Sequence, residues 1–469
     1  MESFVINESD LQTITDSSLK EKIHKLLNLF EELTQKYTQL HNENQYLKAE
    51  LAKLKQQSSP PQLSNKRYAL ISNLKNKQTQ VVWKKSKKKE GLEIDQAIQV
   101  PQITTCVCGS KKFNTIRTDK KIVQGIIFKR NNICYIRKEK KCSDCGKVYK
   151  GEMPKNIERL SFDPELRTFI SYMKFKCRVT QPLIHAMLSD IGIRISTGQI
   201  SNILLTNSQK LIPSYTQLRV WGIKRSSYLQ TDATGHKFKL PSSGKVVDQH
   251  IHFLGNTHLS LFKITPRYNA HVINQLLTTR GRRKPLVSDD GGPNGARLFL
   301  SQKQLCWIHE IRHYLKLTPG LEVNKRKLQD VITKLYNFYH AAISYRDSPN
   351  TVMKRRLQKE FKRLVNKKTG YDALDYRLLL TKRKMERLLF FLDYPMIPIH
   401  NNQAERDLRP AVIIRKISHE TKSLAGNRSI ERHLSVIHTA HKQHLNIWQT
   451  LHGLLTDTIS PFVLTAYTS

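Results

Sequence analysis

The sequence predicts a multidomain α/β protein: an N-terminal coiled coil, a zinc-ribbon-like module, helix-turn-helix-like helices and an α/β core with a helical insertion. Three observations predict this organisation. Leucine recurs at every seventh position near the N-terminus, four cysteines form two close pairs, and short apolar runs that end in aspartates precede a long helical stretch. A chain of 469 residues can hold several such domains and bury a large core.

The net charge of the chain indicates a polyanionic partner. Lys and Arg number 79 against 38 for Asp and Glu, which gives a formal net charge of +41. An excess of this size is typical of proteins that bind nucleic acid. No apolar run is long enough to span a membrane, and the acidic segment from Met1 to Asp10 differs from a basic-then-apolar leader. We therefore expect DNA rather than a membrane as the partner, and a cytoplasmic location.

Residues 18–57 are predicted to form a coiled coil. Leucines stand at positions 19, 26, 33, 40, 47 and 54. The a positions of the same heptads hold Ile23, Phe30, Tyr37, Asn44 and Leu51. A polar Asn at an a position fixes the register and favours two strands, so the pattern predicts a homodimer or a higher oligomer. The alternative is an amphipathic helix that folds onto its own chain.

The segment 58–104 is predicted to be a basic linker. It begins with Pro60 and Pro61, which cannot continue the preceding helix. It also contains a run of lysines: Lys84, Lys85, Lys87, Lys88 and Lys89. Such a run is either a solvated tether or a contact with DNA phosphates, and in neither case does it carry sequence specificity.

Residues 105–152 are predicted to bind zinc. Two close pairs of cysteines, each followed by glycine, supply the candidate ligands Cys106, Cys108, Cys142 and Cys145. Four thiolates make a closed structural site, and the intervening stretch 122–135 is expected to be strand-rich, as in a zinc ribbon. One residue separates the first pair where two are usual, so Cys134 could replace Cys106 or Cys108. The alternative is a group of buried free thiols; a disulfide framework fits a reducing compartment poorly.

Three helices are predicted within residues 160–210. Their N-terminal signals are Asp163-Pro164, Thr180-Gln181-Pro182 and Ser196. The last two helices, joined by a turn that contains Gly192, resemble a helix-turn-helix. Gln199 and Asn202 on the third helix are then candidates to read base edges. Helical hairpins of this kind also occur in ordinary cores, which is the alternative.

An α/β core is predicted over residues 225–440. Its strand candidates are Tyr228–Thr231, His250–Leu254, Leu259–Ile264 and Pro285–Ser288. Asp232 follows the first strand and Asp289 follows the last, each where turn residues begin. Glu405 falls in the first turns of a later helix that Asn401 or Asn402 can cap. Two strand ends and one helix start can thus bring three acids to one place.

Three converging carboxylates would repel each other unless a divalent cation lies between them. Hard oxygen ligands suit Mg²⁺ or Mn²⁺, and two such ions support in-line attack on a phosphodiester. The alternative is three unrelated surface acids. The doublet Asp289-Asp290 leaves open which aspartate is the ligand; Asp289 is preferred because it directly ends the apolar run.

Four segments occur along the chain in a set order: Leu229-Gln230-Thr231-Asp232-Ala233-Thr234, Val287-Ser288-Asp289, Cys306-Trp307-Ile308-His309-Glu310-Ile311-Arg312 and Asn401-Asn402-Gln403-Ala404-Glu405-Arg406. Together they resemble the transposases of the IS66 insertion-sequence family, a DDE-type group with an RNase H-like catalytic core. The resemblance implies that Asp232, Asp289 and Glu405 are a catalytic triad that holds Mg²⁺ or Mn²⁺. Ala233 stands where families of this type often have an acidic residue.

The resemblance also implies contacts with DNA. The Cys-Trp-x-His box places His309 and Arg312 near the DNA or the active site. Basic residues beside and after Glu405 are expected at phosphates: Arg406, Arg409, Arg415 and Lys416. The lone Cys306 beside a histidine is expected to be a buried structural cysteine rather than a nucleophile, because no orienting partner follows from the sequence.

The stretch between Asp289 and Glu405 is too long for one crossover and predicts a helical, basic insertion at about 324–392. Residues 441–469 are expected to form a helical tail. The function that the resemblance implies is cleavage of element ends and transfer into target DNA, in a bacterial nucleoid, with accessory proteins of the element. The alternatives are an inactive dimeric DNA-binding relic and a nuclease that does not join strands.

Overall fold

A computed structural model of this chain describes residues 16–54, 94–99, 104–105, 107–112, 114, 126, 128–153, 161–267, 272–273, 276–277, 284–291 and 302–460. The chain divides into two units, one formed by Met1–Asn42 with Asn132–Ser469 and one by Glu43–Asn131. Among the described residues, no helix is both long and apolar enough to cross a bilayer. The mixture of helices and a mixed sheet agrees with the α/β class predicted from the sequence.

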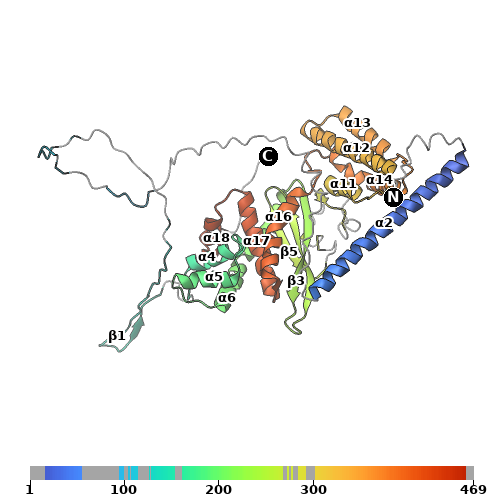
Figure 1. The fold of residues 1–469 in the computed structure, drawn as a ribbon. Helices are drawn as coiled ribbons and strands as arrows, with labels where there is room; N and C mark the ends of the chain where they lie inside the picture. Colours follow the sequence, from blue (N-terminus) through green and yellow to red (C-terminus); the bar gives the residue numbers. More distant parts are fainter. Residues whose placement is uncertain are drawn as a thin grey trace. The chain divides into compact units, whose positions relative to one another are not determined.

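The larger unit contains a six-stranded mixed sheet (Figure 1). Its strands are β3 (Leu229–Lys239), β4 (Val246–Gly255), β5 (Ser260–Thr265), β6 (Leu286–Ser288), β7 (Lys303–Leu305) and β8 (Glu420–Thr421). The order is β5-β4-β3-β6-β7, and β8 pairs with the far part of β3. β4 is antiparallel to both β3 and β5, whereas β6 is parallel to β3 and β7 is parallel to β6.

The four strands predicted from the sequence are present, but the prediction that the first one ends before Asp232 is wrong. β3 has 11 residues and continues through the Ala-Thr-Gly segment to Lys239. The reason is its pairing with β4, which is unbroken from Gln230 opposite Gly255 to Lys239 opposite Val246. A complete antiparallel ladder outweighs the local preference of Gly235 for a turn. The strands β7 and β8 escaped prediction because they are only three and two residues long.

Helices from both ends of the larger unit pack against the antiparallel half of the sheet. α16 (Asn402–Ser418) packs on β3 and β4, and α17 (Leu424–Lys442) packs on β5. Beside α17 lie α4 (Pro164–Phe175), α6 (Thr197–Lys210) and α18 (Ile447–Thr456), and α5 (Gln181–Asp190) packs on α4 and α6 (Figure 1). One continuous apolar core joins these elements, from Ile170 on α4 through Phe253 on β4 to Ile437 on α17.

The three helices predicted between residues 160 and 210 begin at the predicted signals. The Asp163 side chain accepts the Leu166 N–H and caps α4, and Pro lies in the first turn of α4 and α5. Ser196 caps α6 in a reciprocal arrangement with Gln199. A short connection of α7 (Ile212–Gln217), the π-helical turn Leu218–Gly222 and α8 (Ile223–Arg225) then leads into β3. Local capping chemistry thus accounts for these helix starts.

The stretch between β7 and α16 is helical and has a core of its own. It comprises α11 (Trp307–Leu315), α12 (Glu322–Asp347), α13 (Thr351–Val365), α14 (Asp372–Arg383), α15 (Met385–Leu388) and the 3₁₀ turn Phe390–Leu392. The fully buried Trp307 stacks on Phe338 and meets Phe361 edge-on, with ring centroids 4.8 and 5.4 Å away. Its indole N–H donates to the Leu388 carbonyl at 2.8 Å. This separate core is what allows a long insertion to stay folded beside the sheet.

The N-terminal heptads lie on one long helix, α2 (Ser17–Leu54), whose leucines at positions 19, 26, 33, 40 and 47 are about half or more exposed. Of the linker 58–104, only residues 94–99 and 104 are described. The expectation of strands at 122–135 is wrong for its described residues, 126 and 128–135. The hairpin instead comprises β1 (Glu139–Lys141) and β2 (Val148–Lys150), because the Cys142–Gly146 segment makes its turn. Of the expected tail, α18 is present and residues 461–469 lie outside the described part.

Candidate functional site

The register of β3 and β6 brings two of the three predicted acids to one level of the sheet. Gln230 on β3 is paired with Val287 on the parallel strand β6. Asp232 and Asp289 each lie two residues beyond this pair. Because side chains alternate with a period of two, the two carboxylates extend from the same face at the same height. Residues 57 positions apart in the sequence thereby become neighbours across one strand pairing.

The segment after β6 is shaped to leave room for the Asp289 carboxylate. The Cys306 N–H donates to the Ser288 carbonyl at 2.9 Å and ties the end of β6 to the start of α11. A Cβ atom on Gly291 would stand only 2.9 Å from Asp289 Oδ2. Glycine at position 291 therefore allows the carboxylate to take its observed orientation.

Hydrogen bonds between main chain and side chain hold the start of α16 against β3. The Asn401 side chain donates to the Thr231 carbonyl at 2.8 Å, and the Gln230 side chain donates to the His400 carbonyl at 3.1 Å. α16 begins at Asn402 with Asn401 in the N-cap position, but the Asn401 side chain makes no cap bond: its Nδ2 donates to β3, and its buried Oδ1 accepts no hydrogen bond from the described residues. The prediction of an asparagine side-chain cap is wrong, whereas Glu405 does lie in the first turn. The same asparagine thus positions Glu405 beside Asp232.

The three acids influence one another electrostatically. The pKa of Asp232 is raised to about 7, chiefly by burial and also by the negative charges of Asp289 and Glu405, against an opposing hydrogen bond from the Ala233 N–H. That N–H donates to Asp232 Oδ1 at 2.8 Å. The shift shows that Asp232 feels both other carboxylates across a poorly solvated space. Such an arrangement favours the binding of a cation.

Glu405 has basic neighbours on α11. His309 Nε2 and Arg312 Nη1 each lie 3.6 Å from Glu405 Oε1, and they lie 3.4 Å from each other. Glu405 Oε1 is buried, yet no hydrogen bond from the described residues reaches it. An acceptor in this state has an unused capacity for a ligand. His309 and Arg312 therefore lie beside the Glu405 carboxylate, whose charge also acts on Asp232.

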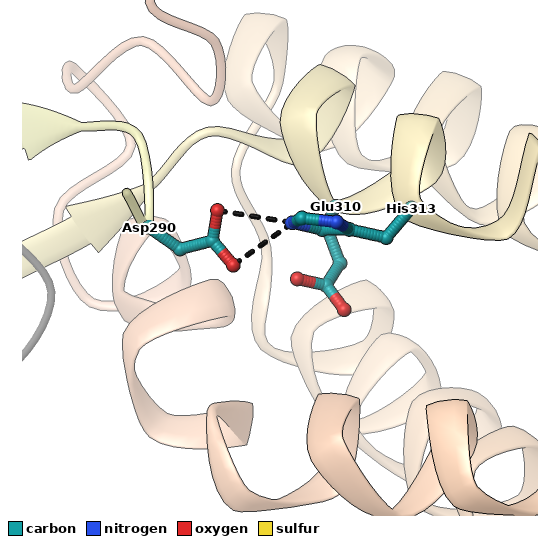
Figure 2. A group of neighbouring side chains, drawn as sticks. All are labelled: Asp290, Glu310 and His313. Carbon is teal, nitrogen blue, oxygen red and sulfur yellow. Dashed lines mark hydrogen bonds and ion pairs between the residues drawn. The ribbon is translucent and has the colours of Figure 1, made fainter. Parts of the chain in front are cut away.

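A second group of acids lies directly beside the first, and sequence reasoning missed it. Asp290, Glu310 and His313 offer ligand atoms within 4.8 Å of one another. Figure 2 shows the Asp290 carboxylate facing the His313 ring, with the Glu310 carboxylate next to them. His313 Nε2 lies 3.1 and 3.0 Å from the two Asp290 oxygens. The available signal was the spacing of Glu310 and His313, which puts both on one face of α11.

This second group already contains its own cations. Lys384 pairs with Asp290 and, at 3.1 Å, with Glu310, and Arg377 pairs with the other oxygen of the buried Glu310. The hydrogen bond from His313, with Lys384 beside it, holds the pKa of Asp290 far below its ordinary value. Thr381 Oγ1 also donates to Glu310 Oε1 at 2.5 Å. Asp290 is thus committed to a salt-bridge network.

The predicted DNA-contacting residues lie in two places. Gln199 and Asn202 are exposed on the outer face of α6, although the Gln199 side chain also completes the helix cap. On α16, Arg406, Arg409 and Lys416 are exposed. The half-buried Arg415 instead donates to Thr234 Oγ1 at 3.1 Å and to the Gly235 carbonyl at 2.6 Å, so it binds β3.

The cysteines fall into separate environments. Cys306 is buried, its Sγ accepts the Asn401 N–H at 3.2 Å, and burial raises the pKa of its thiol to about 11, which disfavours a nucleophilic role. Cys106 lies outside the described residues, and Cys108 belongs to the smaller unit. Cys142 accepts backbone N–H bonds from Cys145 and Asp144 that lower the pKa of its thiol. Gly109 and Gly146, which follow the pairs, have positive φ angles of 82° and 70°.

Comparison with known proteins identifies a family whose sequence profile covers these motifs. The sequence profile of the IS66 family of transposases matches residues 159–429, which include β3, β6, α11 and the start of α16. Over 166 residues the chain is 33% identical to the uncharacterized protein y4jO of Sinorhizobium fredii. That match covers 35% of this chain and 50% of the relative, so the chain spans about half the length of the curated relative that it matches. Since the profile covers more than half of the sequence, the chain belongs to the IS66 transposase family.

Proposed function

We propose that this protein is a DNA transposase that cuts the ends of an insertion sequence and joins them to target DNA, with Asp232, Asp289 and Glu405 as its catalytic carboxylates. The observation that carries the proposal is the equal offset of Asp232 and Asp289 from the Gln230–Val287 pair on parallel strands. Membership of the IS66 transposase family supports the same reaction class.

The topology supports an RNase H-like identity for the core. In such a sheet the first aspartate belongs on the first strand and the second on the fourth. Here Asp232 lies on β3, the first strand of the sheet in chain order, and Asp289 directly follows β6, the fourth. The acid on a later helix is Glu405 in the first turn of α16.

The three carboxylates suit Mg²⁺ or Mn²⁺. They are hard oxygen donors, Glu405 Oε1 is buried without a hydrogen bond from the described residues, and no described lysine is paired with Asp232 or Glu405. Asp232 and Asp289 would hold the ions from the sheet and Glu405 from the helix. When bound, the ions would supply an acidified water and a charge sink for the leaving oxygen.

Asp232 and Arg312 then have different roles in the reaction of the phosphodiester. Asp232 must lose its proton to act as a ligand, and the positive charge of Arg312, 3.6 Å from Glu405, is placed to orient a phosphate. Water attacks the phosphorus at the element end, and the P–O bond breaks to free a 3′-hydroxyl. That hydroxyl attacks a target phosphodiester, and the target strand's own 3′-oxygen leaves.

The same proposal assigns contacts and cofactors outside the catalytic centre. Gln199 and Asn202 would contact base edges, and Arg406, Arg409 and Lys416 would contact phosphates. Zinc would be held by the four paired cysteines; support comes from the positive φ angles of Gly109 and Gly146, which match the tight turns of a zinc knuckle. Self-association through α2 and accessory proteins of the element complete the expected assembly.

The test is strand cleavage and joining on a labelled element-end duplex with Mg²⁺ or Mn²⁺. Glu405→Gln keeps the shape and removes the charge, so we expect activity to fall by about a thousandfold or more while DNA affinity is unchanged. Glu360→Gln is the matched control, because Glu360 lies on α13 with a side chain that is 41% exposed. Equal activity in both variants would remove Glu405 from the site. Binding without cleavage in the wild type would favour an inactive DNA-binding relic, and cleavage without joining would favour a nuclease.

A further inference from the structure

Two helices of the insertion begin without a capping hydrogen bond from the side chain of their own N-cap residue. The N-cap residue of α12 is Leu321 and that of α14 is Tyr371, and neither side chain makes a cap bond. The first N–H groups of a helix have no partner within the helix, and leucine or tyrosine cannot supply one. Both helix starts therefore need acceptors from elsewhere.

α2 supplies these acceptors from one of its faces. The Glu31 carboxylate accepts the Gly320 N–H, the Leu321 N–H at 3.1 Å and the Asn324 side-chain N–H at 3.5 Å. One turn earlier, Asn28 Oδ1 accepts the Asp372 N–H at 3.4 Å. Glu31 is only 2% exposed. A carboxylate at the positive end of α12 is favoured by the helix dipole as well as by these bonds.

The contact is close as well as polar. A Cβ atom on Gly320 would stand 3.2 Å from Thr34 Cγ2 on α2. Asn28, Glu31 and Thr34 are three residues apart and so lie along one face of the helix. α2 thus lies directly against the start of α12, and no larger side chain fits between them without a shift.

The leucines of α2 lie on the opposite face. With leucines at d, Asn28 and Glu31 take the heptad positions f and b, which point away from the a and d positions. Leu26, Leu33 and Leu40 are 66%, 66% and 65% exposed, and Tyr37 at an a position is 71% exposed. A stripe of large apolar side chains this exposed is costly in water unless another surface covers it.

We propose that α2 is a rigid bridge between two copies of this chain. Its Asn28–Glu31 face is fastened to the start of α12 and α14, and its leucine stripe pairs with the same stripe of a second copy. The occupant is a second copy because the heptads are regular and Asn44 at an a position favours a two-stranded coil. The insertions of the two copies are then held at a set separation, whatever chemistry the cores perform.

The test measures the distance between the two insertions in the full-length protein. A bio-orthogonal spin label replaces the exposed Arg326, one turn into α12, and double electron–electron resonance gives the distance distribution between copies. The wild type should give one narrow distribution. Asn28→Ala with Glu31→Ala should leave the dimer intact by light scattering but widen the distribution at least twofold. Glu32→Ala, which removes an exposed pair with Lys36, should leave it narrow.

Two further measurements keep the proposal open to refutation if the double variant misfolds. Leu26→Asp with Leu33→Asp should yield monomers with no distance between copies. In the wild type, the amides of Gly320, Leu321 and Asp372 should exchange slowly with solvent deuterium. Fast exchange of these amides, a monomeric wild type, a dimer that survives both aspartates, or a distribution that stays narrow without Asn28 and Glu31 would each overturn the bridge.

Discussion

Asp289 and Asp290 are adjacent in the chain but belong to two different groups of acids. Asp289 shares a sheet level with Asp232, and the charges of Asp289 and Glu405 both act on Asp232. Asp290 lies with Glu310 and His313 and is paired with Lys384. Asp290 lies two residues beyond the end of β6, where its carboxylate is held by His313 and Lys384.

The comparison teaches that close packing of acids does not by itself make a metal site. The Asp290 group is the tighter one, with ligand atoms within 4.8 Å, but Lys384 and Arg377 already balance its charge. A divalent ion there would have to displace a lysine and leave it buried without a partner. In the Asp232–Asp289–Glu405 group, Arg312 Nη1 lies 3.6 Å from Glu405 and the charge of Asp289 acts on the buried Lys303, but no ion pair from the described residues reaches Asp232. The Asp290 group therefore differs from the other in its close ion pairs with Lys384 and Arg377 as well as in the distances between its ligand atoms.

The sharpest test of this contrast removes one negative charge at a time, from Asp289 in one variant and from Asp290 in the other. Asp289→Asn should abolish metal-dependent cleavage, by about a thousandfold or more, because a ligand is lost. Asp290→Asn should lower thermal stability but leave cleavage within about tenfold of the wild type, because a salt bridge and not a ligand is lost. Cleavage rates at saturating Mn²⁺ measure both. If Asp290→Asn were the inactive variant, the two assignments would have to be reversed.

Removing the Lys384 ammonium group should turn the Asp290–Glu310–His313 group into a metal site. Lys384→Met leaves Asp290 and the buried Glu310 short of a positive charge, so we expect a loss of roughly 3 kcal/mol in the free energy of unfolding. Added Mn²⁺ should then restore part of that loss, as a cation takes the place of the ammonium. Urea unfolding with and without Mn²⁺ measures the effect. Lys382→Met is the control, and an equal response of both variants to Mn²⁺ would contradict the prediction.

A smaller change tests the orientation of Asp289 without touching its charge. Gly291→Ala brings a Cβ atom to 2.9 Å from Asp289 Oδ2, so the carboxylate must move. We expect cleavage to fall by about ten- to a hundredfold with little loss of stability, because a displacement of this size misplaces a ligand. Steady-state cleavage and thermal melting separate the two effects. Wild-type cleavage by the alanine variant would show that the Asp289 orientation is not critical.

The smallest expected effect is the pH dependence that Asp232 confers on the metal-free protein. Its pKa is raised to about 7, so the folded state keeps the proton that the unfolded chain releases near pH 4. This stabilising contribution is complete below about pH 4 and is lost as the pH rises to about 7. Asp232→Asn should therefore raise the melting temperature by a few degrees at pH 8 and by less at pH 4. Equal shifts at both pH values would contradict the raised pKa; Mg²⁺ at pH 8 should stabilise only the wild type.

Local patterns predicted those parts of the fold that depend on a few neighbouring residues. Asp163, Ser196 and the proline-containing first turns mark the helix starts that the structure shows. The apolar runs near Leu229 and Leu286 mark the strands that carry Asp232 and Asp289. Capping and alternation act within a turn or two of chain, so the sequence alone contains them.

Contacts between distant residues were not predictable in this way. Asparagine is a residue type that often caps helices, but the Asn401 side chain donates to the carbonyl of Thr231, a residue 170 positions earlier. The turn-like segment after Asp232 became strand because β4 pairs with all of it. In both cases a partner far along the chain, and not the local alternative, determined the hydrogen bonds that form.

The sequence by itself determined the α/β class, the positions of the main helices and strands, the heptad helix and the three acids proposed for catalysis, since each rests on local chemistry or on a motif. Only the tertiary structure decided which acids lie together and which basic side chains pair with them. Lys384 reaches Asp290 across 94 positions, and β3–β6 pairing sets Asp289 beside Asp232. The physical reason is that charge balance at a site depends on every group that packs around it, and packing is a property of the whole fold.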